Sequence, residues 1–321
     1  MSAPTLYISR LLPDPVMTAA RRQFQLINDP RDASPSWDAV RTGIREADAA
    51  ICTLTDRVDA SMLAEATRLK ILANYAVGYN NIDLAAAKAR GIVVTNTPDV
   101  LTDATADLTW ALLLALARRV AEGDAYVRSG DWSGWAPTQM LGTDVAGKTL
   151  GIVGMGRIGQ AVAQRATGFN MRIRYTSRTG STLDQLPSQW ESRTLPGLLK
   201  EADFVSLHVP LNSATHHLIG ARQFALMKPT AFLINTARGP VIDEAALVDA
   251  LLQRRLAGAG LDVFEQEPAF HPSLRELRQV VLLPHLGSAT LATRVRMGMI
   301  CLENIAAVMA GKPAPNQVQL A

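Results

Sequence analysis

The segment TLGIVGMGRIGQAVAQRAT, residues 149–167, most strongly constrains how this chain can fold. A strand-like apolar run leads into Gly154, Gly156 and Gly159, and a helical pattern follows them. In this spacing the first glycine permits a tight turn, the second lets a pyrophosphate approach the backbone, and the third lets helix and strand pack closely. The pyrophosphate is expected at the N-terminus of the helix that starts near Arg157, where free N–H groups favour an anion. We therefore predict a dinucleotide-binding loop rather than a purely structural turn.

Short apolar runs alternate with helical patterns along the rest of the chain. One series of strand-like runs precedes residue 100 and reads TLYIS, FQLIN, AAICTL, KILANYA and IVVTNT. A second series starts at residue 149 and reads TLGIVG, RIRYTS, FVSLHV, AFLINTA, GAGLDV and VVLLPH. Such alternation is typical of parallel sheets covered by helices. Since 321 residues exceed the usual size of one hydrophobic core, we expect two doubly wound α/β domains.

Two long helical patterns lie outside these series. The first, TADLTWALLLALARRVAEGDAYVRSGDW, joins them, and the second, SATLATRVRMGMICLENIAAVMAG, follows the last strand-like run. If the second helix crosses back to the first series, the N-terminal domain is discontinuous. Among the shorter helical patterns, DLAAAKARG carries Gly91 where a helix would end.

Composition argues against several classes of protein. The net charge is only +3, with Lys and Arg scattered among Asp and Glu, so we expect no nucleic-acid partner. The most apolar segment, Leu108–Ala117, is too short to span a bilayer, and no signal peptide is evident, so we expect a soluble cytoplasmic protein without membrane contact. Cys52 and Cys301 show neither disulfide nor metal-ligand spacing, so we expect two buried thiols and no metal site.

The end of the strand RIRYT predicts which dinucleotide binds. An acidic residue about 20 positions beyond the glycines bonds the ribose 2′-hydroxyl of NAD, whereas an Arg accommodates the 2′-phosphate of NADP. This chain has Ser177, Arg178 and Thr179 there, and no acid before Asp184. We therefore predict a preference for NADP(H), carried by Ser177 and Arg178. The alternative is that Arg178 is a solvated loop residue and that NAD(H) also serves.

A reduction of a carbonyl needs a proton donor, and histidine suits that task near neutral pH. Ligands of open α/β sheets bind at the carboxyl ends of the strands. Of the five histidines, His208 and His285 end predicted strands and are the candidate acids. The others lie in polar loops and are expected to be solvated: His216, His217 and His271.

Charged residues near other strand ends favour His285. The segment GLDVFEQEP brings Asp262, Glu265 and Glu267 to the same sheet edge, and a carboxylate bonded to an imidazole orients it. Arg238, in LINTARGP, has a guanidinium that can bind a substrate carboxylate through two hydrogen bonds. Each group alone is more often structural. Three such groups at successive strand ends favour a catalytic site.

With these motifs in place, the chain resembles the D-isomer-specific 2-hydroxyacid dehydrogenase family, most closely its glyoxylate and hydroxypyruvate reductases. The similarity runs in family order from about Asn74 to Thr290. The blocks that carry it are NYAVGYNNIDLAAAKARGIVVTNTPDVLTDATADL, GKTLGIVGMGRIGQAVAQRATGFNMRI, LHVPLNSATHHLI, LINTARGPVIDEAALVDAL, GLDVFEQEP and LLPHLGSAT.

The resemblance implies specific roles for the substrate-binding and catalytic residues. His285 matches the general acid and Glu267 the carboxylate paired with it. Arg238 matches the residue that binds the substrate carboxylate and polarises the keto oxygen. Val77 and Gly78 match the segment whose backbone N–H groups hold the same carboxylate.

The resemblance also implies the cofactor contacts. Asp262 matches the residue that bonds the nicotinamide amide, and Thr105 lies in the segment that faces the nicotinamide ring. His208 falls in the segment beneath the adenosine half, so it becomes a cofactor contact rather than the acid. Further implied cofactor contacts lie in the matched blocks: Arg157, Ile158, Val209, Pro210, Thr215, Thr236, Ala237 and Gly287.

The resemblance gives the expected domains and assembly. A flavodoxin-like, discontinuous substrate domain is expected at residues 1–99 and 291–321, and a Rossmann-type dinucleotide-binding domain at residues 100–290. Within the latter, a helix and arm at about 100–147 are expected to form a homodimer. Trp135 matches a residue that reaches the neighbouring subunit's site; the alternative is that it fills a groove of its own subunit.

The implied activity is NAD(P)H-dependent reduction of glyoxylate or hydroxypyruvate to glycolate or D-glycerate. A phosphite-oxidising relative carries Lys where this chain has Val77, which argues against phosphite. Two alternatives stay open: a dehydrogenase for another D-2-hydroxy acid such as D-lactate, or a non-enzymatic dinucleotide-sensing corepressor or scaffold. The retained Arg238, Glu267 and His285 argue against the second.

Overall fold

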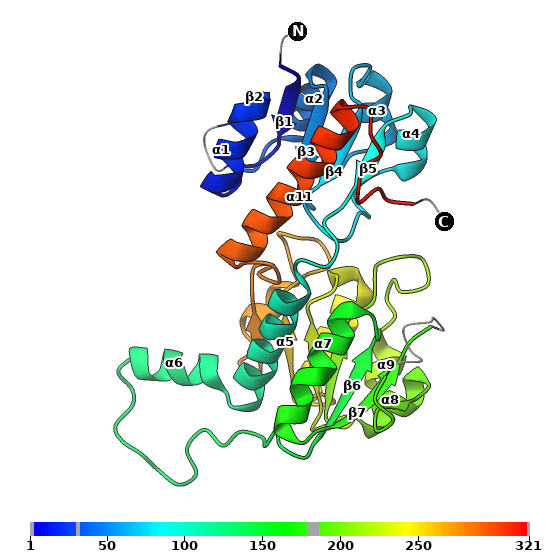
Figure 1. Ribbon diagram of the computed structural model, residues 1–321. Helices are drawn as coiled ribbons and strands as arrows, with labels where there is room; N and C mark the ends of the chain where they lie inside the picture. Colours follow the sequence, from blue (N-terminus) through cyan, green and yellow to red (C-terminus); the bar gives the residue numbers. More distant parts are fainter. Residues whose placement is uncertain (1–2, 30–32, 179–185, 320–321) are drawn as a thin grey trace. The chain divides into compact units, whose positions relative to one another are not determined.

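The computed structural model describes residues 3–29, 33–178 and 186–319 (Figure 1). The chain forms two compact units. Unit 1 comprises Met1–Leu101 and Ser288–Ala321, and unit 2 comprises Thr102–Gly287. The division expected from the sequence ended its first segment at residue 99 and began its last at residue 291.

Unit 1 contains a five-stranded parallel sheet in the order β2-β1-β3-β4-β5. This is the flavodoxin-like strand order. Each strand lies within one of the apolar runs of the first series, so those runs are confirmed as strands. The strands are β1 (Thr5–Ile8), β2 (Gln25–Ile27), β3 (Ala49–Cys52), β4 (Ile71–Asn74) and β5 (Val93–Thr95).

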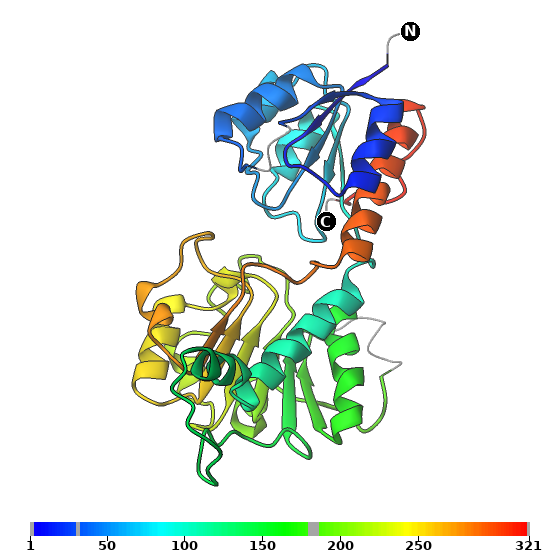
Figure 2. The ribbon, with the colours of Figure 1, turned by 90° about the vertical axis from the view of Figure 1, so that its left-hand side faces the viewer.

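Helices cover both faces of this sheet because successive strand residues point to opposite faces. Leu6 and Ile8 pack with α1 and α11, whereas Tyr7 between them packs on the opposite face. The C-terminal helix α11 lies beside α1, although they come from opposite ends of the chain (Figure 2). The helices are α1 (Asp14–Gln23), α2 (Trp37–Glu46), α3 (Ala60–Glu65), α4 (Leu84–Ala89) and α11 (Leu291–Met309).

The bounds of several helices follow from capping side chains. Ser36, Asp59 and Asp83 accept hydrogen bonds from the N–H groups at the starts of α2, α3 and α4. Helix α4 ends just before Gly91, which adopts a left-handed φ of 68°. The predicted helix end at Gly91 is therefore confirmed.

Unit 2 contains a seven-stranded parallel sheet in the order β12-β11-β10-β9-β6-β7-β8. Its order reverses between β6 and β9, which is the Rossmann arrangement with one more strand. Six strands were predicted; the two-residue β8 was not, because its exposed Glu-Ser sequence has no apolar pattern. The strands are β6 (Thr149–Val153), β7 (Arg172–Thr176), β8 (Glu191–Ser192), β9 (Phe204–Leu207), β10 (Phe232–Asn235), β11 (Gly258–Leu261) and β12 (Val280–Leu282).

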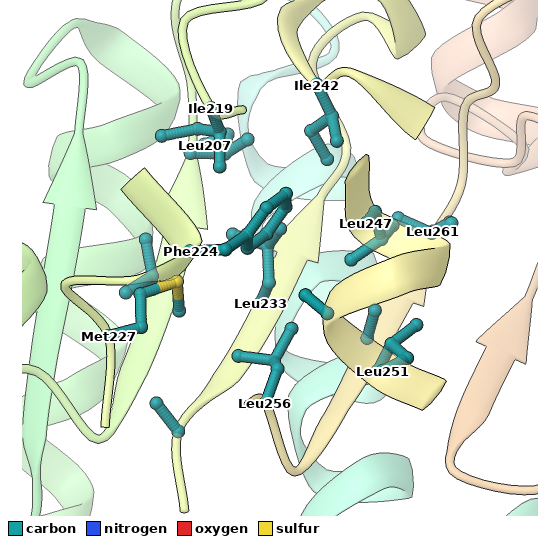
Figure 3. Close-up of a cluster of buried hydrophobic side chains, with 14 of the residues drawn as sticks. Leu207, Ile219, Phe224, Met227, Leu233, Ile242, Leu247, Leu251, Leu256 and Leu261 are labelled. Carbon is teal, nitrogen blue, oxygen red and sulfur yellow. The ribbon is translucent and has the colours of Figure 1, made fainter. Parts of the chain in front are cut away.

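Two apolar layers enclose this second sheet. Leu150 and Ile152 of β6 pack beneath α5 and α7, whereas Val153 belongs to the opposite layer. In that opposite layer, Phe224 packs among leucines and isoleucines from the strands, from α10 and from neighbouring loops (Figure 3). The helices are α5 (Thr102–Ala117), α6 (Val120–Arg128), α7 (Arg157–Ala166), α8 (Leu195–Glu201), α9 (Ala221–Phe224) and α10 (Glu244–Leu252), with 3-10 turns η1 (Thr167–Phe169), η3 (Gly239–Val241) and η4 (Pro272–Arg275).

The long helical pattern between the two series breaks into α5 and α6. Arg119 adopts a left-handed φ of 53°, and its guanidinium pairs with Glu122. The N–H of Thr143 donates to the carbonyl of Ala117 at 2.7 Å, and this carbonyl would otherwise serve the next helical turn. A segment distant in sequence therefore ends α5, which local periodicity cannot reveal.

Both cysteines are buried and unpaired, as predicted. Cys52 lies in β3 and Cys301 in α11, and burial raises the pKa of both thiols. None of the helices in the described ranges combines the length and hydropathy needed to cross a membrane.

Candidate active site

His285 and Glu267 form a hydrogen-bonded pair on the loops that follow β12 and β11. The Nδ1 atom of His285 lies 2.9 Å from Oε2 of Glu267, and the two side chains are 26% and 24% exposed. The backbone of His285 is left-handed at φ 56°, and its N–H donates to the carbonyl of Asp262 at 2.9 Å. The structure therefore brings together the predicted acid and its predicted carboxylate.

The carboxyl group of Glu267 is held in its ionised form. Burial alone would raise its pKa, but the hydrogen bond and charge of His285 outweigh this effect and leave the pKa below its usual value. The N–H of Phe264, 3.1 Å from Oε1, and the charge of Arg238 act in the same direction. A carboxylate is thus available beside the imidazole ring at neutral pH.

Asp262 fixes the loop that carries His285. It is 1% exposed, and its Oδ1 and Oδ2 atoms accept the N–H groups of Leu286 at 2.6 Å and Gly287 at 2.8 Å. Thr105, in α5, donates its hydroxyl to the carbonyl of Gly287 at 3.1 Å. Burial raises the pKa of Asp262, and these N–H groups and His285 oppose the rise. The contact of Asp262 with a nicotinamide amide stays a prediction.

Arg238 is positioned at the end of β10 by close packing of neighbouring loops. Its carbonyl accepts from Nδ2 of Asn235 at 2.9 Å. A Cβ on the next residue, Gly239, would lie 1.8 Å from the carbonyl oxygen of Phe264, so only glycine lets the two loops approach this closely. Burial lowers the pKa of Arg238, and the carboxylate of Glu267 opposes that shift. The charges of Arg238 and Glu267 therefore interact with each other.

His208 lies in a different environment from that of His285. Burial lowers the pKa of His208 to about 3, so its imidazole is neutral near pH 7. Its Nε2 atom lies 2.8 Å from Oγ of Ser206. Its carbonyl packs against the glycine loop, where a Cβ on Gly154 would lie 2.6 Å away. His208 is therefore unsuited to be the acid and lies where a contact with the cofactor was predicted.

Glu265, which was expected at the same sheet edge as Glu267, bonds a different histidine. Its Oε1 atom lies 2.7 Å from Nε2 of His217, and the imidazoles of His216 and His217 stack with centroids 4.0 Å apart. His217, expected to be merely solvated, is thus paired.

The glycine loop has the geometry that the motif predicts. Gly154 adopts a φ of 100°, and a Cβ on Gly159 would lie 2.2 Å from the carbonyl of Gly154. A Cβ on Gly156, in contrast, would meet no atom within 4 Å. Gly156 is also the N-cap of α7, which begins at Arg157 and Ile158, and as a glycine it has no side chain to cap the helix. Open space therefore faces a helix N-terminus.

Ser177 and Arg178 lie exposed immediately after β7, whereas Thr179 lies outside the described residues. Arg174, earlier on the same strand, is instead held by Glu191 and Glu201 at 2.6 and 2.9 Å. Arg178 is thus the arginine of this strand end that faces solvent.

The remaining predicted cofactor contacts lie on the loops after β9 and β10. The hydroxyl of Thr215 donates to the carbonyl of Pro210 at 2.5 Å, which closes the loop that begins at Val209. The hydroxyl of Thr236 lies 2.9 Å from that of Thr109, and Ala237 follows it with its N–H bonded to Asn235 at 3.0 Å. These residues sit at the carboxyl edge of the unit 2 sheet.

Val77 and Gly78 lie in unit 1, in a turn that follows β4. Among the described residues neither of their N–H groups has a hydrogen-bond acceptor. Two adjacent N–H donors without partners suit a carboxylate. Whether they hold the substrate stays a prediction.

Trp135 lies in the segment that follows α6 and is 81% exposed. Within the described part of its own chain, its ring therefore fills no groove. Four other large apolar side chains between residues 120 and 141 are also more than half exposed: Val120, Val127, Trp132 and Leu141.

Comparison with known proteins identifies the family. Residues 110–287 match the model of the D-isomer specific 2-hydroxyacid dehydrogenase, NAD binding domain. The chain belongs to this family.

Similarity to individual proteins supports the same family assignment. The glyoxylate reductase of Thermococcus litoralis is 49% identical over 321 residues, which cover 98% of this chain and 96% of the relative. The crystal structure of the TT0316 protein from Thermus thermophilus is 46% identical, with a TM-score of 0.92 over 98% of this chain and 100% of that one. An NADPH-dependent glyoxylate/hydroxypyruvate reductase from Sinorhizobium meliloti, solved with NADP and malonate, is 33% identical, with a TM-score of 0.88 over 99% of this chain and 97% of that one.

As a 2-hydroxyacid dehydrogenase, the chain is an oxidoreductase that uses a nicotinamide dinucleotide. The predicted family, fold class and enzyme class are confirmed. The glycine loop fits this cofactor, because the space in front of Gly156 and the N-terminus of α7, whose N-cap residue has no side chain, can receive a pyrophosphate.

Glu244 supports the loop that carries Glu267, although it was not predicted from the sequence. Glu244, the buried first residue of α10, accepts the N–H groups of Glu265 and His271. Its own N–H donates to Oε2 of Glu265 at 3.1 Å. These bonds fix the loop that carries Glu267. The only sequence signal was an acidic residue at a helix start, which is common.

Proposed function

We propose that this 2-hydroxyacid dehydrogenase reduces glyoxylate, hydroxypyruvate or both, giving glycolate or D-glycerate. The observation that carries the proposal is the pair of His285 and Glu267, 2.9 Å apart, beside the charge of Arg238. Relatives named glyoxylate reductase support the substrate, since they match this chain over nearly its whole length.

When bound, the reduced nicotinamide supplies a hydride to C2 of the 2-oxo acid. Side chains of the protein hold and donate the proton. The ionised Glu267 holds Nδ1 of His285 and stabilises the imidazolium form, so that Nε2 can donate a proton to the developing alkoxide. The hydride and this proton together convert the keto group to a hydroxyl. His285 is left neutral and regains its proton from solvent.

Arg238 supplies the positive charge for the substrate. Its guanidinium can bind the carboxylate of the 2-oxo acid through two hydrogen bonds and polarise the neighbouring keto oxygen. Burial strengthens this attraction because fewer waters compete for the charge. We also propose that the free N–H groups of Val77 and Gly78 bind the same carboxylate.

We propose a preference for NADP(H) over NAD(H). Ser177 and Arg178 are exposed at the end of β7, and no acidic residue occurs among them to bond a 2′-hydroxyl. A guanidinium there favours the 2′-phosphate. The Sinorhizobium meliloti relative, which is named NADPH-dependent, supports this assignment.

We propose that the chain forms a homodimer through the helix and arm expected at about 100–147; residues 120–141 of this region are here called the arm. Five of its large apolar side chains are each more than half exposed, and apolar surface of this kind is typical of interfaces between subunits. Trp135, the most exposed of them, is proposed to approach the partner's substrate site. The cytoplasmic location stays a prediction.

Steady-state kinetics with glyoxylate, hydroxypyruvate and pyruvate, each with NADPH and with NADH, tests the proposal. We expect turnover of glyoxylate or hydroxypyruvate with a higher kcat/KM than pyruvate, and a higher kcat/KM for NADPH than for NADH. Pyruvate as the best substrate would instead indicate a D-lactate dehydrogenase. Equal kcat/KM values for the two nucleotides would disprove the preference for NADP(H).

A further inference from the structure

The loop that carries Glu267 is closed by one buried carboxylate. Glu244, the first residue of α10, is 8% exposed. Its Oε2 atom accepts the N–H of Glu265 at 3.1 Å, and its Oε1 atom accepts the N–H of His271. These two donors lie on either side of Glu267 in the sequence. Glu244 therefore joins the two ends of residues 265–271, here called the Glu267 loop.

Further contacts hold the same two ends together. The N–H of Glu244 donates to Oε2 of Glu265 at 3.1 Å, so these two residues bond each other reciprocally. Phe264 and Phe270, which immediately precede the two bonded ends, stack with ring centroids 4.8 Å apart. The base of the Glu267 loop is thus closed by hydrogen bonds and by an aromatic contact.

The base of the loop also holds the carboxylate of Glu267. The N–H of Phe264 donates to Oε1 of Glu267 at 3.1 Å. The next peptide group joins Phe264 to Glu265; its N–H bonds Glu244, and its carbonyl oxygen would lie 1.8 Å from a Cβ on Gly239. A peptide group is planar, so contacts on both of its sides restrict its orientation. Phe264 is therefore held on its C-terminal side by Glu244, and it donates to Glu267 on its N-terminal side.

We propose that Glu244 is a positioning residue that holds Glu267 where it bonds Nδ1 of His285. The inference rests on the proposed function, because it takes the pair of Glu267 and His285 as the source of the proton. The bond between them is 2.9 Å long, and a charge-assisted bond depends on distance and alignment. If the loop ends separate, Glu267 gains conformations in which this bond is lost, and the imidazolium is stabilised less.

Glu244 differs in its contacts from the ionisable groups that act on Glu267 directly. The charges of His285, Arg238 and Asp262 interact with that of Glu267. The carboxylate of Glu244 instead accepts backbone N–H groups of the loop. A substitution of Glu244 therefore changes the support of Glu267 and keeps these three side chains.

Glu244→Gln tests this role, because it keeps the length of the side chain and places an amide donor opposite one of the two N–H donors. We expect the alkaline limb of the kcat/KM profile for glyoxylate to move to lower pH by about half a unit or more, whereas KM for NADPH stays unchanged. The direction is that of Glu267→Gln, since both variants weaken the support of the protonated imidazole. A merely structural role would lower the unfolding temperature and leave the profile in place.

The double variant Glu244→Gln with Glu267→Gln shows whether Glu244 acts through Glu267. Once the charge of Glu267 is gone, its position no longer decides how well that charge stabilises His285. We therefore expect the alkaline limb of the double variant to coincide with that of Glu267→Gln alone. A further move, as large as the one that Glu244→Gln causes by itself, would show that Glu244 acts on His285 by another route and would overturn the inference.

Asp243→Asn is the matched control. Asp243 is the N-cap of α10, and its Oδ1 atom accepts the N–H of Ala246 at 3.0 Å, so it bonds the helix and not the loop. This substitution removes the same charge at the start of the same helix, and we expect an unmoved alkaline limb. If Asp243→Asn moves the limb as far as Glu244→Gln does, the lost charge or a loosened helix start explains the effect and the inference is wrong.

The outcomes separate this inference from the proposed function. A wild-type protein that reduces no 2-oxo acid refutes the function itself. An alkaline limb that moves in Glu267→Gln but not in folded Glu244→Gln overturns only the role of Glu244. Should Glu244→Gln not fold, Glu244→Asp decides by the same criterion, because it keeps the charge but is one methylene too short to reach both N–H groups.

Discussion

Glu267 bonds one ring nitrogen of His285, and the other has no hydrogen-bond partner in the described part of the chain. The carboxylate at Nδ1 orients the ring and favours its protonated form. The free Nε2 is then the atom from which a proton can leave. Asp262 accepts the N–H groups of His285 and Leu286, where the backbone turns through a left-handed conformation. These bonds hold in place the backbone that carries His285 in its pair with Glu267.

Replacing His285 by Ala removes the proposed proton donor. We expect kcat to fall by about 10²- to 10⁴-fold, the range found for general acids, with the dissociation constant of NADPH nearly unchanged. Fluorescence titration and steady-state kinetics measure both. His216→Ala, at an exposed histidine outside the site, is the control and should retain wild-type turnover. Near-normal kcat in His285→Ala would exclude His285 as the acid.

Replacing Glu267 by Gln changes the pH dependence of reduction. The wild-type carboxylate has a lowered pKa and therefore stays ionised throughout the neutral range. Without its negative charge the imidazolium loses its stabilising partner, so reduction should fail at a lower pH than in the wild type. We expect the alkaline limb of the kcat/KM profile to move to lower pH by about one unit or more. An unmoved alkaline limb would show that Glu267 does not stabilise the acid.

The burial of His208 predicts that the stability of the folded protein, rather than its activity, depends on pH. Burial lowers its pKa from 6.5 to about 3, so between these values the unfolded chain binds a proton that the folded chain does not. The free energy of unfolding should therefore fall as pH decreases from 6.5 toward 3, by up to ~1.4 kcal/mol per pH unit from this one group. Well above pH 6.5 the imidazole is neutral in both states and contributes no slope.

Urea denaturation at pH 7, 6 and 5 measures this slope. His208→Gln should flatten it, because the buried imidazole is then absent. Identical slopes in the wild type and in His208→Gln would mean that His208 is not buried in solution.

Arg178→Ala tests the nucleotide preference. We expect kcat/KM for NADPH to fall by about tenfold or more, with the value for NADH unchanged, because only the 2′-phosphate loses a charged partner. Arg172→Ala removes another exposed arginine, at the start of β7, and should leave the ratio unchanged. A ratio unaffected by Arg178→Ala would support the alternative of a solvated Arg178.

Val127→Glu tests the homodimer by placing a charge among the apolar side chains of the arm. We expect the wild type to sediment as a dimer and the variant as a monomer, because burying an unpaired carboxylate is costly. Leu252→Glu adds the same charge at an exposed leucine of α10 and should stay dimeric. A monomeric wild type would refute the proposed assembly.

The strands were predictable because buried parallel strands are short apolar runs, and nearly all of them stand out in this sequence. The features that could not be predicted from the sequence depend on contacts between residues far apart in the chain. The end of α5 is set by Thr143, and the two-residue β8 is defined only by pairing with β7. Neither leaves a local pattern.

The site was predictable to the level of candidate residues and not beyond it. His208 and His285 both follow apolar runs, and in the fold the burial of His208 and the bond of His285 to Glu267 distinguish them. Glu265 and Glu267 are two positions apart, yet they bond different histidines. Glu244 starts a helix, but its bonds to the Glu267 loop required the folded backbone.

The most direct test of the proposed reduction follows the hydride from NADPH to the product. NADPH with deuterium at both C4 positions is incubated with glyoxylate and the wild-type protein, and the glycolate formed is analysed by mass spectrometry. We expect glycolate with one deuterium on C2, formed at a rate that His285→Ala reduces by about 10²-fold or more. Tight binding of NADPH with no glycolate, or glycolate without deuterium, would contradict the proposed reduction.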